Sequence, residues 1–372
     1  MSARNQLKAD FLAAAGWQDT QIAPLAGDAS FRRYDRLNHP THGPAVLMDA
    51  PPDMGEDCRP FVAINQWLED AGFRAAHIIA HDIKNGFVLL EDLGDTLFAR
   101  HLQTAPQDEA TLYSAAIDAL VALHQQPQPT TLALDYKLPP YDHAELLREV
   151  MLLPDWYWPA TKGQDCPATV REEFEALWQA ALMPLWPPQH PVMVLRDYHA
   201  ENLFWLPDSE RPQDKPQAGR QARPQDRPQD RPQDKVGIID HQDALLGHRA
   251  YDLVSLLEDA RRLISPALRE QMTDRYAAQT NVDRVTLDTD FALLAAQRNT
   301  KIIGIFARLE NRDGKQGYLA KTPLVWFYLK QDLTHPALHD VKDWFDRHFS
   351  DDLNSDDMSF DVLRSDEKGT SA

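Results

Sequence analysis

The strongest constraint on the fold is a pair of short apolar segments that flank a proline-rich repeat. Residues 211–235 read RPQDKPQAGRQARPQDRPQDRPQDK, contain no aliphatic residue larger than Ala and cannot bury a core. The apolar run NLFWL ends shortly before this repeat, and VGIID begins directly after it. Apart from the repeat, only a few residues join the two runs, which predicts a β-hairpin with the repeat as a disordered insert at its tip.

This hairpin places three oxygen-bearing side chains near one another. Asp197 and Asn202 precede or begin the first strand, and Asp240 ends the second. Carboxylate and amide oxygens are the ligands that Mg²⁺ prefers. The spacing D-x-x-x-x-N, followed by an apolar strand ending in Asp, matches the phosphoryl-transfer pattern, in which one Asp orients the acceptor hydroxyl and the other two residues hold metal-bound phosphates. We therefore expect the three side chains to converge.

Length and charge restrict the partners of the chain. Its 372 residues can bury one large core or two adjoining ones. With 38 basic and 57 acidic residues, the formal net charge of −19 repels nucleic acid and anionic membranes. The two cysteines, Cys58 and Cys166, lie too far apart in the sequence to indicate a disulfide framework. We expect a cytoplasmic protein, a monomer or weak dimer, that acts on a small molecule without binding nucleic acid or membrane.

Strand signals precede helical ones along the chain. The segments FRRYDRL, AVLMDA and FVLLEDL in the first 95 residues read as strands, and a helix closed by Gly72 lies between the last two. From about Thr111 onward the apolar spacing is mostly helical. The pattern predicts an α+β fold with a small β-rich N-lobe and a larger helical C-lobe. We expect a nucleotide-binding lobe over residues 1–93, a catalytic and substrate lobe over 94–349 and an acidic flexible tail over 350–372.

Four motifs together resemble a known family. They are GDASFRRY (27–34), VLLEDLGD (88–95), LRDYHAENLFW (195–205) and GIIDHQDALLGHRAYDLVSLLEDAR (237–261). This combination is similar to that of the aminoglycoside phosphotransferase-like kinases, which share the two-lobed protein-kinase fold. The resemblance implies that ATP and Mg²⁺ serve as cofactors and that a hydroxyl group accepts the phosphate. It is nearest to the bacterial group that phosphorylates the anomeric hydroxyl of N-acetylmuramate and N-acetylglucosamine in peptidoglycan recycling.

The resemblance also implies roles for individual residues. It makes Asp197 the catalytic base and makes Asn202 and Asp240 the Mg²⁺ ligands, in agreement with the residue-level argument above. It implies a hinge whose backbone meets adenine and a loop that covers the phosphates. The hinge comprises Glu91, Asp92 and Leu93; the loop includes Gly27, Asp28 and Ser30 and continues into Phe31.

One position departs from the wider kinase pattern. Met48 and Asp49 stand where a strand lysine normally binds the α- and β-phosphates. Arg32 or Arg33 could bind the same phosphates with a bidentate guanidinium. Because neighbouring residues on a strand point in opposite directions, one of the two would face solvent.

Several polar residues near these motifs have more than one interpretation. His199 either contacts the substrate or orients Asp197. The resemblance implies that Arg196 steadies the loop or the phosphate, and the alternative is a surface cation. Gln242 and Asp243 are predicted to face the acceptor sugar. Asp252 is expected to cap or brace the helix that follows it.

Three other functions fit parts of the pattern. A zinc-dependent hydrolase could use Asp197, His199, Asp240, His241 and Asp243, although no tight histidine pair is present. The missing strand lysine would also suit a nucleotide-binding pseudokinase. The acidic composition leaves aminoglycosides and choline-like cations open as acceptors.

Overall fold

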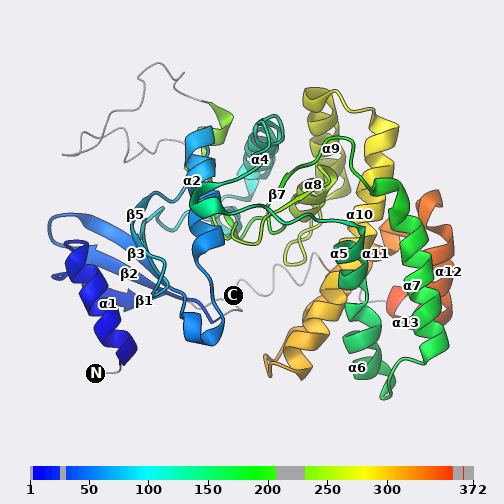
Figure 1. The fold of residues 1–372 in the computed structure, drawn as a ribbon. Helices are drawn as coiled ribbons and strands as arrows, with labels where there is room; N and C mark the ends of the chain where they lie inside the picture. The colour runs from blue at the N-terminus through cyan, green and yellow to red at the C-terminus, as the bar shows by residue number, and fades with distance from the viewer. Residues whose placement is uncertain (1–2, 26–30, 207–230, 355–362, 364–372) are drawn as a thin grey trace. The chain divides into compact units, whose positions relative to one another are not determined.

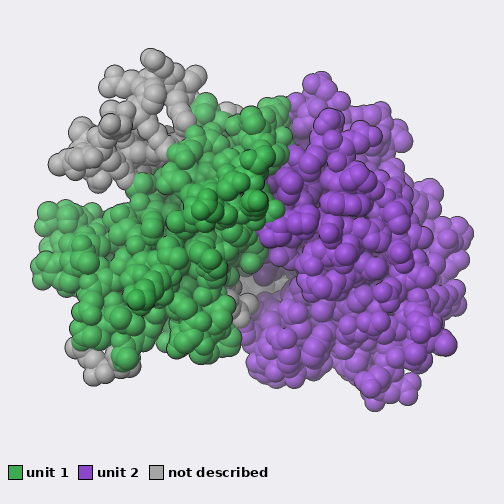
Figure 2. Space-filling view, in the orientation of Figure 1, with its two compact units in different colours: residues 1–138, 200–244 green, residues 139–199, 245–372 purple. Residues whose placement is uncertain are grey.

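The computed structural model describes residues 3–25, 31–206, 231–354 and 363. The chain forms two compact units, which Figure 2 colours separately. The first comprises residues 1–138 and 200–244, and the second comprises residues 139–199 and 245–372. The chain therefore changes unit between His199 and Ala200, within the motif that contains Asp197 and Asn202. The lobe boundary predicted after residue 93 is a different division and stays a prediction.

The first unit contains a five-stranded antiparallel sheet in the order β1-β2-β3-β6-β5. Its strands are β1 (Gln21–Pro24), β2 (Arg33–His39), β3 (Gly43–Asp49), β5 (Ile78–Asp82) and β6 (Phe87–Glu91). These elements are the blue and cyan arrows of Figure 1. Strands β2, β3 and β6 confirm the three segments that were predicted to be strands.

Each face of this sheet buries a different helix. In β3, Ala45 and Leu47 join a cluster with Phe11 and Leu12 of α1 (Ala3–Ala14). On the opposite face, Met48 joins a cluster with residues of α2, which spans Arg59–Ala71. Because successive strand residues point to opposite faces, alternate residues of β3 pack against α1 on one face and against α2 on the other. Helix α2 ends at Gly72, as predicted, and the left-handed φ of 95° at that residue suits glycine.

The remainder of the first unit contains the predicted hairpin. Strand β8 (Leu203–Trp205) pairs antiparallel with β9 (Val236–Ile238), with Leu203 opposite Ile238. Strand β4 (Arg74–Ala75) completes this small sheet, and helices α3 (Phe98–Thr104) and α4 (Glu109–His124) accompany it. The last repeat of the insert forms a 3-10 turn over Pro232–Asp234. Residues 211–230 of the predicted insert lie outside the described residues.

The second unit is mainly helical. Its two strands, β7 (Val192–Val194) and β10 (Leu245–Gly247), pair antiparallel. Its helices are α5 (His143–Val150), α6 (Trp158–Lys162), α7 (Ala168–Leu182), α8 (Ala250–Leu257), α9 (Pro266–Thr280), α10 (Arg284–Asn311), α11 (Thr322–Asp332), α12 (His339–His348) and α13 (Ser350–Leu353), with a π-helical turn over Leu153–Tyr157. The yellow helix α10 packs against α5, α8 and α11 (Figure 1).

Helix α10 approaches the π-helical turn closely. A Cβ atom at Gly304 would lie 2.4 Å from the backbone carbon of Leu152, so no larger residue fits there. The same helix contains five consecutive polar residues, Gln297 to Lys301, whose side chains are all buried. Burial of such a run is destabilising unless the side chains form hydrogen bonds or ion pairs. The run therefore indicates a polar network in this unit. Across the described residues, none of the helices combines the length and apolar character needed to cross a membrane.

Candidate active site

The loop that carries Asp197 follows strand β7 and is held by a buried carboxylate. Asp252 on α8 is fully buried, and its two oxygens accept the backbone N–H groups of Leu195 at 2.7 Å and Arg196 at 2.8 Å. Burial raises the pKa of Asp252 to about 7, against the opposing effect of these two hydrogen bonds. The cap expected from Asp252 is not formed: the residue lies within the first turn of α8, and its carboxyl group braces the loop before Asp197 instead.

Arg196 is fixed by a second buried carboxylate. Its φ of 71° is unusual for a residue with a large side chain. Its guanidinium donates to Glu149 Oε1 at 2.6 Å, and Lys301 Nζ lies 2.8 Å from the same oxygen. The hydroxyl of Tyr141 and the amide of Gln297 donate to the other oxygen of Glu149. The geometry thus favours the interpretation that Arg196 steadies the loop over the alternative of a surface cation.

Glu149 remains a carboxylate despite its burial. Burial raises its pKa, but the charges of Lys301 and Arg196 outweigh that effect and hold the pKa below its ordinary value. The ionised Glu149 therefore fixes the strained backbone at Arg196 through a strong ion pair.

Asp197 is surrounded by positive charge. Its side chain is 48% exposed, and Arg298 Nη2 of α10 lies 3.9 Å from its Oδ1 atom. Burial of the carboxyl raises its pKa, but the positive charges of Arg298, Lys301 and Arg196 contribute to lowering it below the ordinary value. Asp197 is consequently ionised at neutral pH and available to accept a hydrogen bond or a proton.

His199 is buried beside this loop and is neutral. His199 is 3% exposed, and Arg261 Nη1 lies 3.3 Å from its Nε2 atom. Because a guanidinium can only donate, Nε2 accepts and the imidazole proton is assigned to Nδ1. Burial lowers the pKa of His199 below its ordinary value. Whether it contacts a substrate or orients Asp197 stays a prediction.

A second group of polar residues lies in the first unit. Asn202 Nδ2 is 3.5 Å from Asp240 Oδ2, and the backbone carbonyl of Asn202 accepts the N–H of Ile239. Gln242 Nε2 donates to Asp240 Oδ1 at 2.7 Å, while Asp243 is exposed. Asp240 has a φ of 58°, a conformation that Asp tolerates better than most residues. The hairpin therefore brings Asn202 and Asp240 together, and Gln242 orients the carboxylate of Asp240.

The amide and carboxylate oxygens of Asn202 and Asp240 are hard donors and fit a Mg²⁺ ion that shares its remaining positions with phosphates and water. Among the described residues, no group of three or more His, Cys, Asp or Glu side chains is placed to hold a metal. The structure therefore gives no support to the zinc site of the hydrolase interpretation. Convergence of Asp197, which belongs to the other unit, with this pair stays a prediction.

The segment before β2 places Arg32 and Arg33 differently, and which of them binds phosphates stays a prediction. Arg32 Nε lies 3.7 Å from Glu56 Oε2, and the backbone N–H of Phe31 donates to Glu56 Oε1 at 3.0 Å. Burial and, to a smaller extent, the charge of Arg32 lower the pKa of His241 to about 3. Arg32 is thus near the residue that follows Asp240, whereas Arg33 is exposed. Gly27, Asp28 and Ser30 lie outside the described residues.

Asp49, at the position of the missing strand lysine, forms ion pairs with basic residues of α1. Arg4 Nε of α1 donates to Asp49 Oδ1 at 2.9 Å, and Lys8 Nζ lies 3.7 Å from Asp49 Oδ2. Met48 is fully buried in the apolar cluster against α2. Sequence reasoning missed this arrangement, although the i, i+4 spacing of Arg4 and Lys8 on one helix face was a usable signal.

The residues predicted to form the hinge follow β6. Glu91 forms a bidentate pair with Arg74, with Nη1 at 2.7 Å from Oε2, and Asp92 pairs with Arg36 at 2.8 Å. Leu93 packs on the cluster of β3 and α2. Both acidic side chains are therefore engaged within the protein, and the backbone is the part of this segment that suits a ligand.

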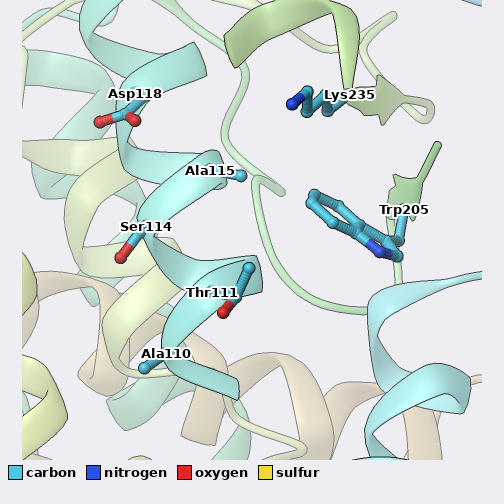
Figure 3. A pocket seen from close by; sticks show the side chains of 7 residues that line it. All are labelled: Ala110, Thr111, Ser114, Ala115, Asp118, Trp205 and Lys235. Carbon is cyan, nitrogen blue, oxygen red and sulfur yellow. The ribbon is translucent and has the colours of Figure 1, made fainter. Parts of the chain in front are cut away.

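A separate pocket is present in the first unit. Its volume is about 460 Å³, and it is lined by one face of α4 together with Trp205 and Lys235 (Figure 3). In Figure 3 the indole of Trp205 faces the helix across the opening. None of the site residues predicted from the sequence lines this pocket.

Comparisons with known proteins identify the family. The pattern of the phosphotransferase enzyme family matches residues 21–212. An N-acetylmuramate/N-acetylglucosamine kinase of Caulobacter vibrioides is 36% identical over 377 residues, covering 93% of this chain and 97% of the relative. The chain belongs to the phosphotransferase enzyme family. A kinase of the same name from Pseudomonas putida is 34% identical, with 83% of each chain covered.

Solved structures show the same fold at low sequence identity. An aminoglycoside phosphotransferase in complex with gentamicin has a TM-score of 0.58 at 12% identity, covering 91% of this chain and 98% of the other. A choline/ethanolamine kinase family protein from Mesorhizobium loti has a TM-score of 0.56 at 12% identity, with the same coverage. The predicted protein-kinase-like α+β fold is confirmed. The family also confirms that the chain is a phosphotransferase, and the hydrolase interpretation is therefore wrong.

Proposed function

We propose that this phosphotransferase uses ATP and Mg²⁺ to phosphorylate the anomeric hydroxyl of N-acetylmuramate and N-acetylglucosamine. The observation that carries the proposal is the similarity to kinases of that name over almost the whole length of both chains, at 36% identity in one case. The structural neighbours, at 10–14% identity, support the fold and do not distinguish between acceptors.

Asp197 is the proposed base. Its lowered pKa keeps it ionised at neutral pH, and Asp252 and the Glu149–Arg196 pair fix the loop that presents it. An anomeric hydroxyl is more acidic than an ordinary alcohol, so a base with a low pKa suffices to orient it and accept its proton. This match between a weak base and an acidic acceptor favours the anomeric position over the other hydroxyls of the sugar.

Asn202 and Asp240 are the proposed ligands of Mg²⁺. The ion, when bound, neutralises charge on the β- and γ-phosphates as the phosphoryl group moves. Gln242 keeps the carboxylate of Asp240 in place through the 2.7 Å hydrogen bond. Arg32 is the proposed substitute for the strand lysine, since its charge is felt at His241 beside Asp240, whereas Arg33 is exposed.

The charge around Asp197 bears on the choice of acceptor. Arg298 lies beside its carboxylate, and Arg261 contacts the neighbouring His199. A polycationic aminoglycoside or a quaternary ammonium group would be repelled by these guanidinium groups. A neutral or acidic sugar is therefore a better acceptor than either alternative cation, despite the acidity of the chain as a whole.

Release of ADP tests the proposal. Purified protein with ATP and Mg²⁺ is offered N-acetylmuramate, N-acetylglucosamine, kanamycin and choline in turn. We expect turnover with the two N-acetylated sugars only. Turnover with kanamycin or choline alone would contradict the proposed acceptor, and bound ATP without turnover of any acceptor would favour the pseudokinase.

A further inference from the structure

Three of the buried polar atoms that have no hydrogen-bond partner among the described residues belong to one part of the second unit. They are Asp259 Oδ2, His199 Nδ1 and Arg298 Nη1. The residues that carry them are 1%, 3% and 3% exposed. A buried polar atom without a partner is destabilising, and native proteins satisfy almost all such atoms with protein groups, ordered water or a bound ligand.

The contacts of these residues hold them in one cluster within the second unit. Asp259 Oδ1 accepts the backbone N–H of Arg261 at 2.9 Å, and the guanidinium of Arg261 donates to His199 Nε2 at 3.3 Å. Arg298 Nη2 donates to Ser255 Oγ at 3.0 Å and lies 3.9 Å from Asp197 Oδ1. Each residue therefore uses one polar atom inside the protein and leaves another without a partner.

The unused atoms comprise one acceptor and two donors. As a carboxylate, Asp259 can only accept a hydrogen bond at Oδ2, and Arg298 can only donate at Nη1. A carboxylate ligand would be repelled by Asp259, and an ammonium ligand would be repelled by Arg298. A neutral group that carries both an N–H and a C=O satisfies the two without repulsion, and an amide is the simplest such group.

We propose that this cluster binds the acetamido group of the acceptor sugar, with the amide N–H donating to Asp259 and the amide C=O accepting from Arg298. The inference rests on the proposed function and specifies how the acceptor is recognised. In a 2-acetamido sugar this group is attached to the carbon next to the anomeric carbon. A binding site beside Asp197 thus places the anomeric hydroxyl near the base. The Nδ1–H of His199 remains for a neighbouring sugar oxygen.

The variant Asp259→Asn tests the inference with little change in volume. The N–H of Arg261 requires an acceptor, so the side-chain oxygen of Asn keeps that bond and its NH₂ group takes the place of Oδ2. A donor then faces the amide N–H of the sugar. We expect kcat/KM for N-acetylglucosamine to fall about 10- to 100-fold, while kcat/KM for 2-deoxyglucose, which has no 2-substituent, changes less than about threefold.

Asp283→Asn is the matched control. Asp283 also accepts a backbone N–H, that of Thr286 at 3.0 Å, but it lies on the exposed N-terminus of α10. This control should leave the kinetics of both sugars unchanged. The unfolding temperatures of both variants show whether Asp259→Asn is folded, and the preference of the wild-type chain for N-acetylglucosamine over 2-deoxyglucose tests the same contact without any substitution.

The outcomes separate the inference from the proposed function. Equal loss with both sugars in Asp259→Asn, or no preference of the wild-type chain for the N-acetylated sugar, overturns the acetamido site while the kinase assignment stands. If the wild-type chain phosphorylates no amino sugar, the proposed function fails and the acetamido site fails with it. Selective loss with N-acetylglucosamine in the folded variant supports both.

Discussion

Replacement of Asp252 by Asn should change how stability depends on pH. Asp252 is fully buried, and its pKa in the folded chain is about 7, well above the 3.8 of an exposed Asp. Between these two values the folded chain holds a proton that the unfolded chain releases. The contribution of Asp252 to stability is therefore largest below the lower value and declines as the pH rises toward the higher one.

The size of this effect follows from the two pKa values. Between about pH 5 and pH 8, the free energy of unfolding of the wild-type chain should lose about 2–3 kcal/mol that Asp252→Asn does not lose. The measurement is urea-induced unfolding of both chains at several pH values, with the difference between them plotted against pH. Taking the difference removes the contribution of the other carboxyl groups.

An exposed aspartate supplies the control. Hydrogen bonds from Thr286 lower the pKa of Asp283, so its contribution is already complete at pH 5 and Asp283→Asn should give a flat difference up to pH 8. A difference between wild type and Asp252→Asn that is flat, or that rises with pH, would refute the argument that burial keeps Asp252 partly protonated.

Three further substitutions and one control test the site. Arg32→Gln should raise KM for ATP about tenfold because it removes a charged hydrogen-bond donor, whereas Arg33→Gln, at an exposed position, should have less than about a twofold effect in the same ADP-release assay. Asp240→Asn should raise the Mg²⁺ concentration needed for half-maximal turnover, and an unchanged Mg²⁺ dependence would contradict its proposed role. Glu149→Gln leaves Arg196 and Lys301 without a buried counter-charge. It should therefore lower the free energy of unfolding, measured in urea, by about 3–5 kcal/mol. A loss below about 1 kcal/mol would contradict this account.

The parts of the fold that local sequence patterns determine were predicted correctly. Short segments rich in aliphatic and aromatic residues identified β2, β3 and β6, and Gly72 marked the end of α2. The hairpin of β8 and β9 was identified despite the insert, because a proline-rich repeat cannot continue either strand. Helix α1 was missed because only Phe11 and Leu12 are buried on it, too few to establish a helical period.

The supporting contacts of the site could not be predicted from local patterns. Glu149 pairs with Lys301, and Arg298 approaches Asp197, across large separations in the sequence. A periodic pattern indicates which face of an element is buried but not which buried charge meets which. Asp252 illustrates the same limit: its place on a helix suggested a cap, while its partners are backbone groups of a distant loop.

The position of the transferred phosphate tests the central claim most directly. Phosphorus NMR of the product formed from N-acetylglucosamine, ATP and Mg²⁺ distinguishes a sugar 1-phosphate from the other phosphate esters. We expect the wild-type chain to form the 1-phosphate, and Asp197→Asn to form no product while it still binds ATP. Phosphate on a different hydroxyl, or unchanged product formation by Asp197→Asn, would contradict the assignment of Asp197 as the base for an anomeric acceptor.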